Sequence, residues 1–169
     1  MLLPILKYGA PDLKVKAKQT DLFNGELEKI AKNMIETMYS ASGVGLAANQ
    51  VGLDLCITTI DLSAGRDASQ LITICNPEII STEGEQTDEE GCLSIPDFNE
   101  IVVRPRKMIV RGQDIHGEEI RIIADNMLAR CLSHEIDHLK GILFIDHLSG
   151  LKRSMIKNRI KRLAKDGKW

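Results

Sequence analysis

The sequence lacks several features that would define its class at once. No apolar run among the 169 residues approaches the roughly 18–20 residues needed to span a membrane. The stretch "MLLPILKYGAPDLK" has no basic segment before its apolar part and no small-residue cleavage site after it, so we expect no signal peptide. There is also no internal repeat, low-complexity tract or linker. A composition of 43% hydrophobic and 27% charged residues is typical of one globular domain, here covering residues 1–169.

The four cysteines include no C-x-x-C pair, so nothing indicates a disulfide framework. Cys56, Cys75 and Cys131 lie in apolar surroundings, which is typical of buried small hydrophobic side chains. Without disulfides or an export signal we expect a cytoplasmic protein that has neither a membrane nor specific DNA as a partner. Cys92 is the exception, because it lies among the turn residues of "EEGCLSIP".

The net charge of −2 is distributed unevenly along the chain. Residues 149–169 contain eight Lys or Arg residues and one acid, Asp166, and therefore carry a charge of +7. The remaining residues carry −9. A basic segment on an acidic body is typical of a protein with a polyanionic partner, and a solvated helix face is the alternative interpretation.

Hydrophobic spacing and capping residues predict three helices, at residues 24–39, 127–140 and 149–165. Stretches rich in β-branched residues predict strands at 54–62 and 70–77. Residues 100–124 are interpreted as two or three strands with a turn at "DIHG". The order of helix, strands, helix and helix indicates an α+β fold rather than alternating βαβ units.

The segment "SHEIDHLKG" (133–141) contains the pattern His-Glu-x-x-His. On a helix, His134 and His138 project from consecutive turns and can bind one ion, while Glu135 can reach a water molecule on that ion. A helical projection places these three side chains in or beside the apolar arc, and four polar residues fall on the opposite, solvent-facing arc: Arg130, Ser133, Asp137 and Lys140. The inward position favours a metal site over a pair of core histidines beside a salt-bridged glutamate.

The pattern supplies two ligands, and a catalytic ion usually takes three from the protein. Phe144 stands where the metzincin pattern has its third histidine, and no glutamate follows Glu135 to act as in thermolysin-like enzymes. Three downstream residues remain conceivable ligands: Asp146, His147 and Asp166. Cys92 is attractive because a thiolate binds zinc or ferrous iron strongly. Two histidines and one cysteine would leave a position for water, as a catalytic site requires.

Three segments resemble, in order and approximate spacing, the signature motifs of the peptide deformylases. "GVGLAANQ" (43–50) is similar to G-x-G-L-A-A-x-Q, "EGCLSIP" (90–96) to E-G-C-L-S-x-P, and "HEIDHLKG" (134–141) to H-E-x-D-H-L-x-G. The resemblance extends to "ILKYGAPDLK" and "DHLSGLKR" and so covers essentially the whole chain. Many bacterial members have an arginine three residues after the second motif's proline. This chain has Asn99 there, which leaves the contacts at the substrate entrance open.

The resemblance implies strands packed around a central metal-binding helix, antiparallel or mixed, with N-terminal and C-terminal helices. It implies an enzyme that removes the formyl group from the formyl-methionine of nascent polypeptides and releases formate. By this resemblance Cys92, His134 and His138 bind one divalent metal ion, with Fe²⁺ as the physiological ion and Zn²⁺, Ni²⁺ or Co²⁺ as replacements. The bound water would attack the formyl carbon while Glu135 acts as general base and then general acid.

The resemblance assigns stabilisation of the developing oxyanion to the Gln50 side chain and the Leu93 backbone N–H. It also implies that the substrate peptide lies extended beside Val44 and Gly45 as an added strand. The methionine side chain would enter an apolar pocket, for which we expect three lining residues: Ile95, Leu128 and Cys131. Two residues are expected to support the cysteine turn: Glu90 and Ser94.

The basic segment after residue 149, by similarity to bacterial members, is expected to contact the ribosome near the nascent-chain exit. Two other hypotheses compete with a deformylase. A zinc peptidase of the His-Glu-x-x-His type would cleave internal peptide bonds, although its usual downstream ligands are missing here. A non-catalytic ribosome-associated or metal-storing protein would need neither Glu135 nor Gln50, and both are present.

Overall fold

The computed structural model describes residues 1–169 and contains one five-stranded sheet and three α-helices. The strands follow one another across the sheet in chain order, and every neighbouring pair is antiparallel. They are β1 (Gly45–Ala47), β2 (Ile57–Ile60), β3 (Ile72–Cys92), β4 (Ile95–Gln113) and β5 (Glu119–Asp125). The helices are α1 (Gly25–Ser40), α2 (Asn126–Leu139) and α3 (Gly150–Lys165). The expected α+β fold is therefore confirmed. None of the helices has both the length and the hydropathy of a membrane-spanning segment.

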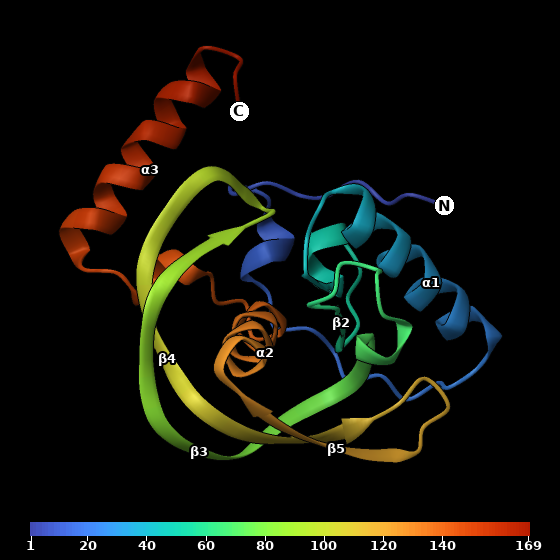
Figure 1. Cartoon of the computed structure of the whole chain (residues 1–169). Helices are drawn as coiled ribbons and strands as arrows, with labels where there is room; N and C mark the ends of the chain where they lie inside the picture. The colour runs from blue at the N-terminus through green and yellow to red at the C-terminus, as the bar shows by residue number, and fades with distance from the viewer.

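The long strands β3 and β4 bend around α2, which is seen end-on near the centre of Figure 1. They form one hairpin that is paired from Cys75 and Gln113 to Cys92 and Ile95, and register shifts interrupt the ladder at three places. A turn of two residues, Leu93 and Ser94, joins the strands. The turn of this hairpin, with Cys92 at the end of β3, therefore lies next to α2, the helix that contains the two histidines.

The sequence prediction for the strands was only partly right. The predicted strand at 70–77 was too short, because β3 continues through the mostly polar residues 78–91 to Cys92. Most of this extension is exposed, so it lacks the alternation of polar and apolar residues that marks a half-buried strand. Residues 100–124 contain two strands, β4 and β5, joined by the expected turn at 114–117. The three-residue strand β1, inside "GVGLAANQ", was missed.

Helix α1 begins where the sequence predicted. Its N-cap, Asn24, accepts hydrogen bonds from the backbone N–H groups of Glu26 (3.1 Å) and Leu27 (3.2 Å), which a helix start leaves without partners. One face of α1 packs Leu27, Ala31, Met34 and Met38 into a core cluster that includes residues of β1, β2 and β3. This packing holds β1 in place at the edge of the sheet.

Helix α2 is largely enclosed by other elements, and the expected solvent-facing arc was mostly wrong, because only Lys140 of that arc is exposed. Arg130 and Ser133 were placed on that arc, yet they are only 3% and 6% exposed. Arg130 is buried because its guanidinium pairs with the Glu90 carboxylate at 2.8 Å. The apolar side of α2 packs Leu132 and Ile136 against Met108 and Val110 of β4 and other buried residues of the sheet.

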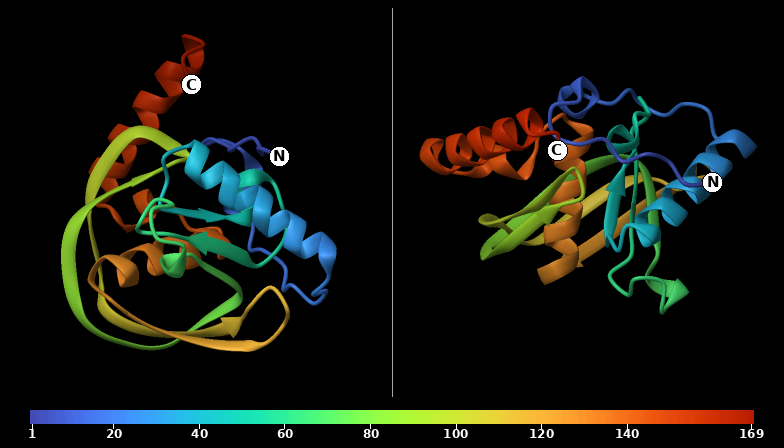
Figure 2. Two further views of the ribbon diagram at one scale, coloured as in Figure 1. Left: turned by 45° about the vertical axis from the view of Figure 1, so that its right-hand side comes forward. Right: turned by 90° about the horizontal axis from the view of Figure 1, so that it is seen from above.

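Helix α3 projects beside the rest of the molecule (Figure 2). Ile156 and Ile160 join a core cluster that includes Ile95 and Phe144, whereas Leu151 and Met155 are exposed. Trp169 follows α3, and its indole Nε1 donates a hydrogen bond to the Tyr8 carbonyl at 2.8 Å. The helix is thus attached along one narrow apolar side, which leaves most of its basic residues in solvent.

Candidate active site

The three expected metal ligands converge between the β3–β4 turn and α2. The distance from Cys92 Sγ to His138 Nε2 is 3.2 Å, and that from His138 Nε2 to His134 Nε2 is 3.1 Å. All three ligand atoms lie within 4.8 Å of one another. Atoms bound at about 2.0–2.3 Å to one tetrahedral ion lie about 3.3–3.8 Å apart, so the set is close to the spacing that a single ion needs.

The downstream ligand candidates lie elsewhere. His147 Nε2 is 2.7 Å from Asp137 Oδ2, and Asp146 Oδ2 accepts a hydrogen bond from the Leu143 backbone N–H. Asp166 is exposed at the end of α3. The fold therefore brings Cys92, and none of these three, to the two histidines.

The electrostatics of the cluster also suit a cation. Burial alone would lower the pKa of His134, but the neighbouring Cys92 and Glu90 outweigh it and raise the pKa to about 10. The position thus favours positive charge, which a bound cation can supply in place of the proton. Burial, together with the nearby His134 and Arg104, holds the pKa of His138 well below its usual value, so its imidazole is neutral and can act as a ligand.

Glu90 sets the orientation of His134. Its Oε2 is 3.0 Å from His134 Nδ1. When a cation replaces the proton on Nε2, the proton that remains on Nδ1 leaves the lone pair of Nε2 directed at Cys92 and His138. Glu90 also receives two hydrogen bonds from Arg104, at 2.8 and 3.0 Å, and one from Arg130 at 2.8 Å. Burial opposes ionisation of Glu90, yet its partners lower its pKa to about 2. The expected supporting role of Glu90 thus has a defined geometry.

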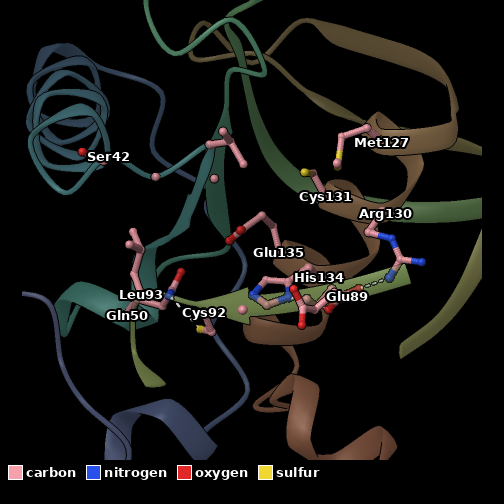
Figure 3. A pocket seen from close by; sticks show the side chains of 15 residues that line it. Ser42, Gln50, Glu89, Cys92, Leu93, Met127, Arg130, Cys131, His134 and Glu135 are labelled. Atoms are coloured by element: carbon pink, nitrogen blue, oxygen red, sulfur yellow. Dashed lines mark hydrogen bonds and ion pairs between the residues drawn. The ribbon is translucent and has the colours of Figure 1, made fainter. Parts of the chain in front are cut away.

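Glu135 points toward β1 and has no such partners (Figure 3). Its side chain is buried, and Oε2 lacks a hydrogen-bond partner. Burial raises the pKa of Glu135 to about 7, and the nearby His134 offsets part of this rise. A Cβ at Gly45 would overlap the Glu135 carboxylate, so this position of the strand requires glycine. A carboxyl with this pKa can accept and release a proton near neutral pH.

Gln50 lies on the 3₁₀ helix η2 (Ala48–Val51), directly after β1. Its Oε1 accepts a hydrogen bond from the Ala47 backbone N–H at 2.9 Å, which fixes the direction of the amide. Its Nε2 then faces the β3–β4 turn, 3.2 Å from Ser94 Oγ and 3.6 Å from Cys92 Sγ. Leu93 follows Cys92 in the same turn, so both residues expected to bind an oxyanion border the cluster.

A cavity of about 380 Å³ opens beside these groups (Figure 3). Its lining includes Gln50, Cys92, Leu93, His134 and Glu135. Three of the residues expected to contact substrate line it as well: Val44, Gly45 and Cys131. Burial raises the pKa of the Cys131 thiol to about 12, so this lining residue stays uncharged.

Two other residues expected in the pocket do not line it. Ile95 is fully buried in the core cluster that includes Phe144, because it follows the hairpin turn and faces away from the cavity. Leu128 packs against the cluster between α2 and the sheet. Met127 takes the place expected for Leu128 and is half-exposed at the cavity. The signal was in the sequence, because Met127, Cys131 and Glu135 are spaced four residues apart and share one side of the helix.

Comparisons with known proteins identify the family of the chain. The family model described as polypeptide deformylase matches residues 2–154. A peptide deformylase of Acidobacterium capsulatum is 45% identical over 169 residues, covering 100% of this chain and 99% of the relative. One of Thermodesulfovibrio yellowstonii is 48% identical over 160 residues, covering 95% and 97%.

Solved structures lead to the same family. The crystal structure of a peptide deformylase from Legionella pneumophila has a TM-score of 0.90 and 41% sequence identity, and the match covers 98% of each chain. That of Synechococcus elongatus, solved in complex with actinonin, has a TM-score of 0.88 at 37% identity and covers 98% of this chain and 88% of its own. The chain belongs to the polypeptide deformylase family.

Proposed function

We propose that this enzyme removes the N-formyl group from the N-terminal formyl-methionine of nascent polypeptides and releases formate. Membership of the deformylase family supports the reaction class. The observation that carries the residue assignment is the meeting of the cysteine and two histidines with an unpartnered, buried carboxyl at one cavity. A cavity that combines ligands, a proton acceptor and an amide donor is suited to hydrolysis of a small amide.

In this proposal Cys92, His134 and His138 hold one divalent ion. Such an ion, when bound, lowers the pKa of a water molecule and supplies a nucleophile near neutral pH. We propose Fe²⁺ as the physiological ion, and Zn²⁺, Ni²⁺ or Co²⁺ as replacements that the same donor set accepts. The cysteine thiolate and the neutral imidazoles are the ligand chemistry that these ions share.

Glu135 is proposed to move the protons. Its carboxylate accepts a proton from the attacking water and then donates it to the amine that leaves the formyl carbon. The raised pKa supports both steps, because a group with a pKa of about 7 is present in both forms at neutral pH. Gln50 Nε2 and the Leu93 backbone N–H would donate hydrogen bonds to the formyl oxygen as it gains negative charge. Loss of one such donor typically costs about 10²–10³ in rate.

The substrate is proposed to bind along β1. β1 is an edge strand of the sheet and pairs only with β2, so its other side has no strand partner. Val44 and Gly45 line the cavity beside it. An extended peptide can pair with such an edge. Met127 and Cys131 offer uncharged, sulfur-containing walls for the methionine side chain, and thioether and thiol groups pack well against a flexible apolar chain.

We also propose that α3 directs the enzyme to the ribosome near the nascent-chain exit, which places it in the cytoplasm. The segment 149–169 carries +7, and its basic side chains are largely exposed. Nucleic acid phosphates attract such a surface, so this interaction would weaken steeply as salt is raised. Sedimentation of the protein with ribosomes at two salt concentrations tests this part separately from the chemistry.

The function is tested by an anaerobic assay that follows formate release from formyl-Met-Ala-Ser while the metal content is measured. We expect Glu135→Ala to retain the ion and lose turnover, and Cys92→Ala to lose both. Full activity of the Glu135 variant would refute the proton role, and normal metal content in the Cys92 variant would refute the ligand assignment. Cleavage of internal peptide bonds without formate release would instead favour a zinc peptidase.

A further inference from the structure

Asn49 is a buried polar residue that the proposed chemistry does not use. It lies on η2 between Ala48 and Gln50 and is 4% exposed. Its Nδ2 donates a hydrogen bond to the backbone carbonyl of His138, a residue 89 positions away in the chain. The only side chains hydrogen-bonded to His138 are those of Asn49, Cys92 and His134. Asn49 is thus the contact that joins His138 to an element other than the hairpin turn and α2.

The bond is made where α2 ends. The last carbonyls of a helix have no partner within the helix. Here the Ile142 N–H bonds to the Asp137 carbonyl at 2.9 Å instead of continuing the helix to His138. The His138 carbonyl receives the Gly141 N–H at 2.9 Å on one side and the Asn49 amide on the other. Asn49 therefore fixes the terminal turn of the helix at the residue that carries the ligand.

The same 3₁₀ helix also faces the cysteine. Gln50, the next residue, directs its Nε2 at Cys92 Sγ, and its own carbonyl accepts the Leu6 N–H at 2.7 Å. Two consecutive side chains of η2 therefore bridge the turn that holds Cys92 and the helix end that holds His138. The distance between these two ligands depends on η2 as well as on the hairpin.

The two histidines differ in their support. His134 Nδ1 is paired with Glu90, whereas His138 Nδ1 is buried without a partner. Asn49 Oδ1 is likewise buried without a partner. A metal-bound histidine is usually held by a hydrogen bond through its other nitrogen. His138 is held instead through its backbone carbonyl, which accepts a hydrogen bond from Asn49 Nδ2, and Asn49 Oδ1 has no partner.

We propose that Asn49 is a positioning residue that holds His138 in place relative to Cys92 and so sets the affinity of the three ligands for a divalent ion. The inference rests on the proposed metal site and goes beyond it, because Asn49 is neither a ligand nor a group that contacts substrate. Loss of partners that orient a metal ligand typically costs 10–100-fold in metal affinity. We expect an effect of that size from loss of the Asn49 amide.

The test measures the zinc dissociation constant by competition with a chromophoric chelator. Asn49→Leu removes both polar atoms at similar volume, and Asn49→Ser is a smaller variant that avoids overpacking if the leucine variant does not fold. We expect both to bind zinc about 10–100-fold more weakly than the wild type. With Co²⁺ bound, their ligand-field spectra should differ from that of the wild type, which reports a changed ligand geometry. The urea-unfolding free energy of each metal-free protein is measured alongside.

Val51→Ala is the matched control, because Val51 lies on the same 3₁₀ helix and packs in the core without contacting a ligand. We expect it to lower the unfolding free energy and leave zinc affinity unchanged. If folded Asn49 variants bind zinc within twofold of the wild type, or no more weakly than the control, the positioning role is refuted. Failure of the wild type to bind one zinc per chain would refute the proposed metal site itself.

Discussion

Glu90 and Glu135 are two buried carboxyl groups beside the same histidine, and their pKa values are shifted in opposite directions. Glu90 is hydrogen-bonded to His134 and to two arginines, and its pKa falls to about 2. Glu135 is the chain neighbour of His134, has an oxygen without any partner, and its burial raises the pKa to about 7. Burial alone therefore does not decide the ionisation of a carboxyl group; the partners supplied by distant segments do.

The comparison also separates structural roles from chemical ones. The charges of Glu90 and Asp137 are balanced by those of Arg104 and Arg130, and the Arg104 guanidinium joins the two carboxylates at 2.8 and 2.5 Å. Nothing balances Glu135 to that extent. An unpaired buried carboxyl lowers stability, which is why Glu135 is a candidate for the proton role proposed above.

The largest expected effect on stability comes from Glu90→Gln. The substitution leaves Arg104 and Arg130 buried opposite a neutral amide, and loss of one partner from a buried ion pair typically costs about 3–5 kcal/mol. Glu135→Gln is the matched substitution, and we expect its unfolding free energy to equal or exceed that of the wild type. Urea denaturation of the metal-free proteins measures both. Similar losses in the two variants would show that the contrast between the carboxyl groups does not exist.

Gly45→Ala sharpens the comparison on the side of Glu135. The added methyl group would overlap the carboxylate and displace it from the cavity. A displacement of about 1 Å at a reacting group can cost about 10²-fold in rate, and we expect a fall of that size in kcat. Gly25→Ala is the control, because a Cβ at this position would meet no atom within 4 Å. Equal activities of the two variants would contradict the role given to the position of Glu135.

The distances along the chain between interacting residues explain which parts of the site could be predicted from the sequence. The spacing of His134, Glu135 and His138 is local, so a helical projection places them together correctly. The same projection wrongly placed Arg130 in solvent, because its burial depends on Glu90, 40 residues earlier in the chain. Likewise Cys92 could be favoured as a ligand only through chemistry and family resemblance, since no spacing rule links a strand end to a helix that follows two strands later.

The strands show the same division. The short apolar strand β2 is fully buried and was recognised from its β-branched residues. The outer part of β3 is exposed, and its polar sequence carries no periodic signal, so its strand structure depends on pairing with β4. Ile95 was expected in the pocket because of its motif, but the two-residue turn before it directs its side chain into the core. Side-chain direction after a turn depends on turn geometry that the motif does not reveal.

Asp61 extends the comparison to a third buried carboxyl, away from the metal ligands. Burial opposes its ionisation, but hydrogen bonds from Tyr39, Ser63 and Gly65 lower its pKa from 3.8 to about 2. Above about pH 5 the group is ionised in both states and its contribution is complete. As the pH falls from about 5 to 2, the unfolded chain takes up the proton first, so about 2 kcal/mol of stability is lost.

Asp61→Asn tests this contribution. The difference in unfolding free energy between the wild type and the variant should be largest above pH 5 and should shrink toward pH 2. Tyr39→Phe removes the shortest of the hydrogen bonds, at 2.6 Å, and should reduce the pH-dependent loss without abolishing it. Urea denaturation at several pH values measures each difference. A difference that stays constant from pH 5 to 2 would mean that folding does not lower the pKa of Asp61.

The smallest expected effect concerns an ion pair that lacks burial. Lys152 of α3 is 2.8 Å from Glu100 of β4, with side chains 50% and 27% exposed, whereas Arg104 is 4% exposed at a similar distance from its partners. Exposed pairs are worth about 0–1 kcal/mol and are screened by salt. We therefore expect Lys152→Gln to change the unfolding free energy by less than about 1 kcal/mol at low salt, and by nothing measurable in 1 M NaCl. A larger, salt-independent loss would mean that this pair, rather than the buried Ile156 and Ile160, attaches α3. If the packing of Ile156 and Ile160 is enough to attach α3, the other exposed basic side chains of the helix are not needed for attachment.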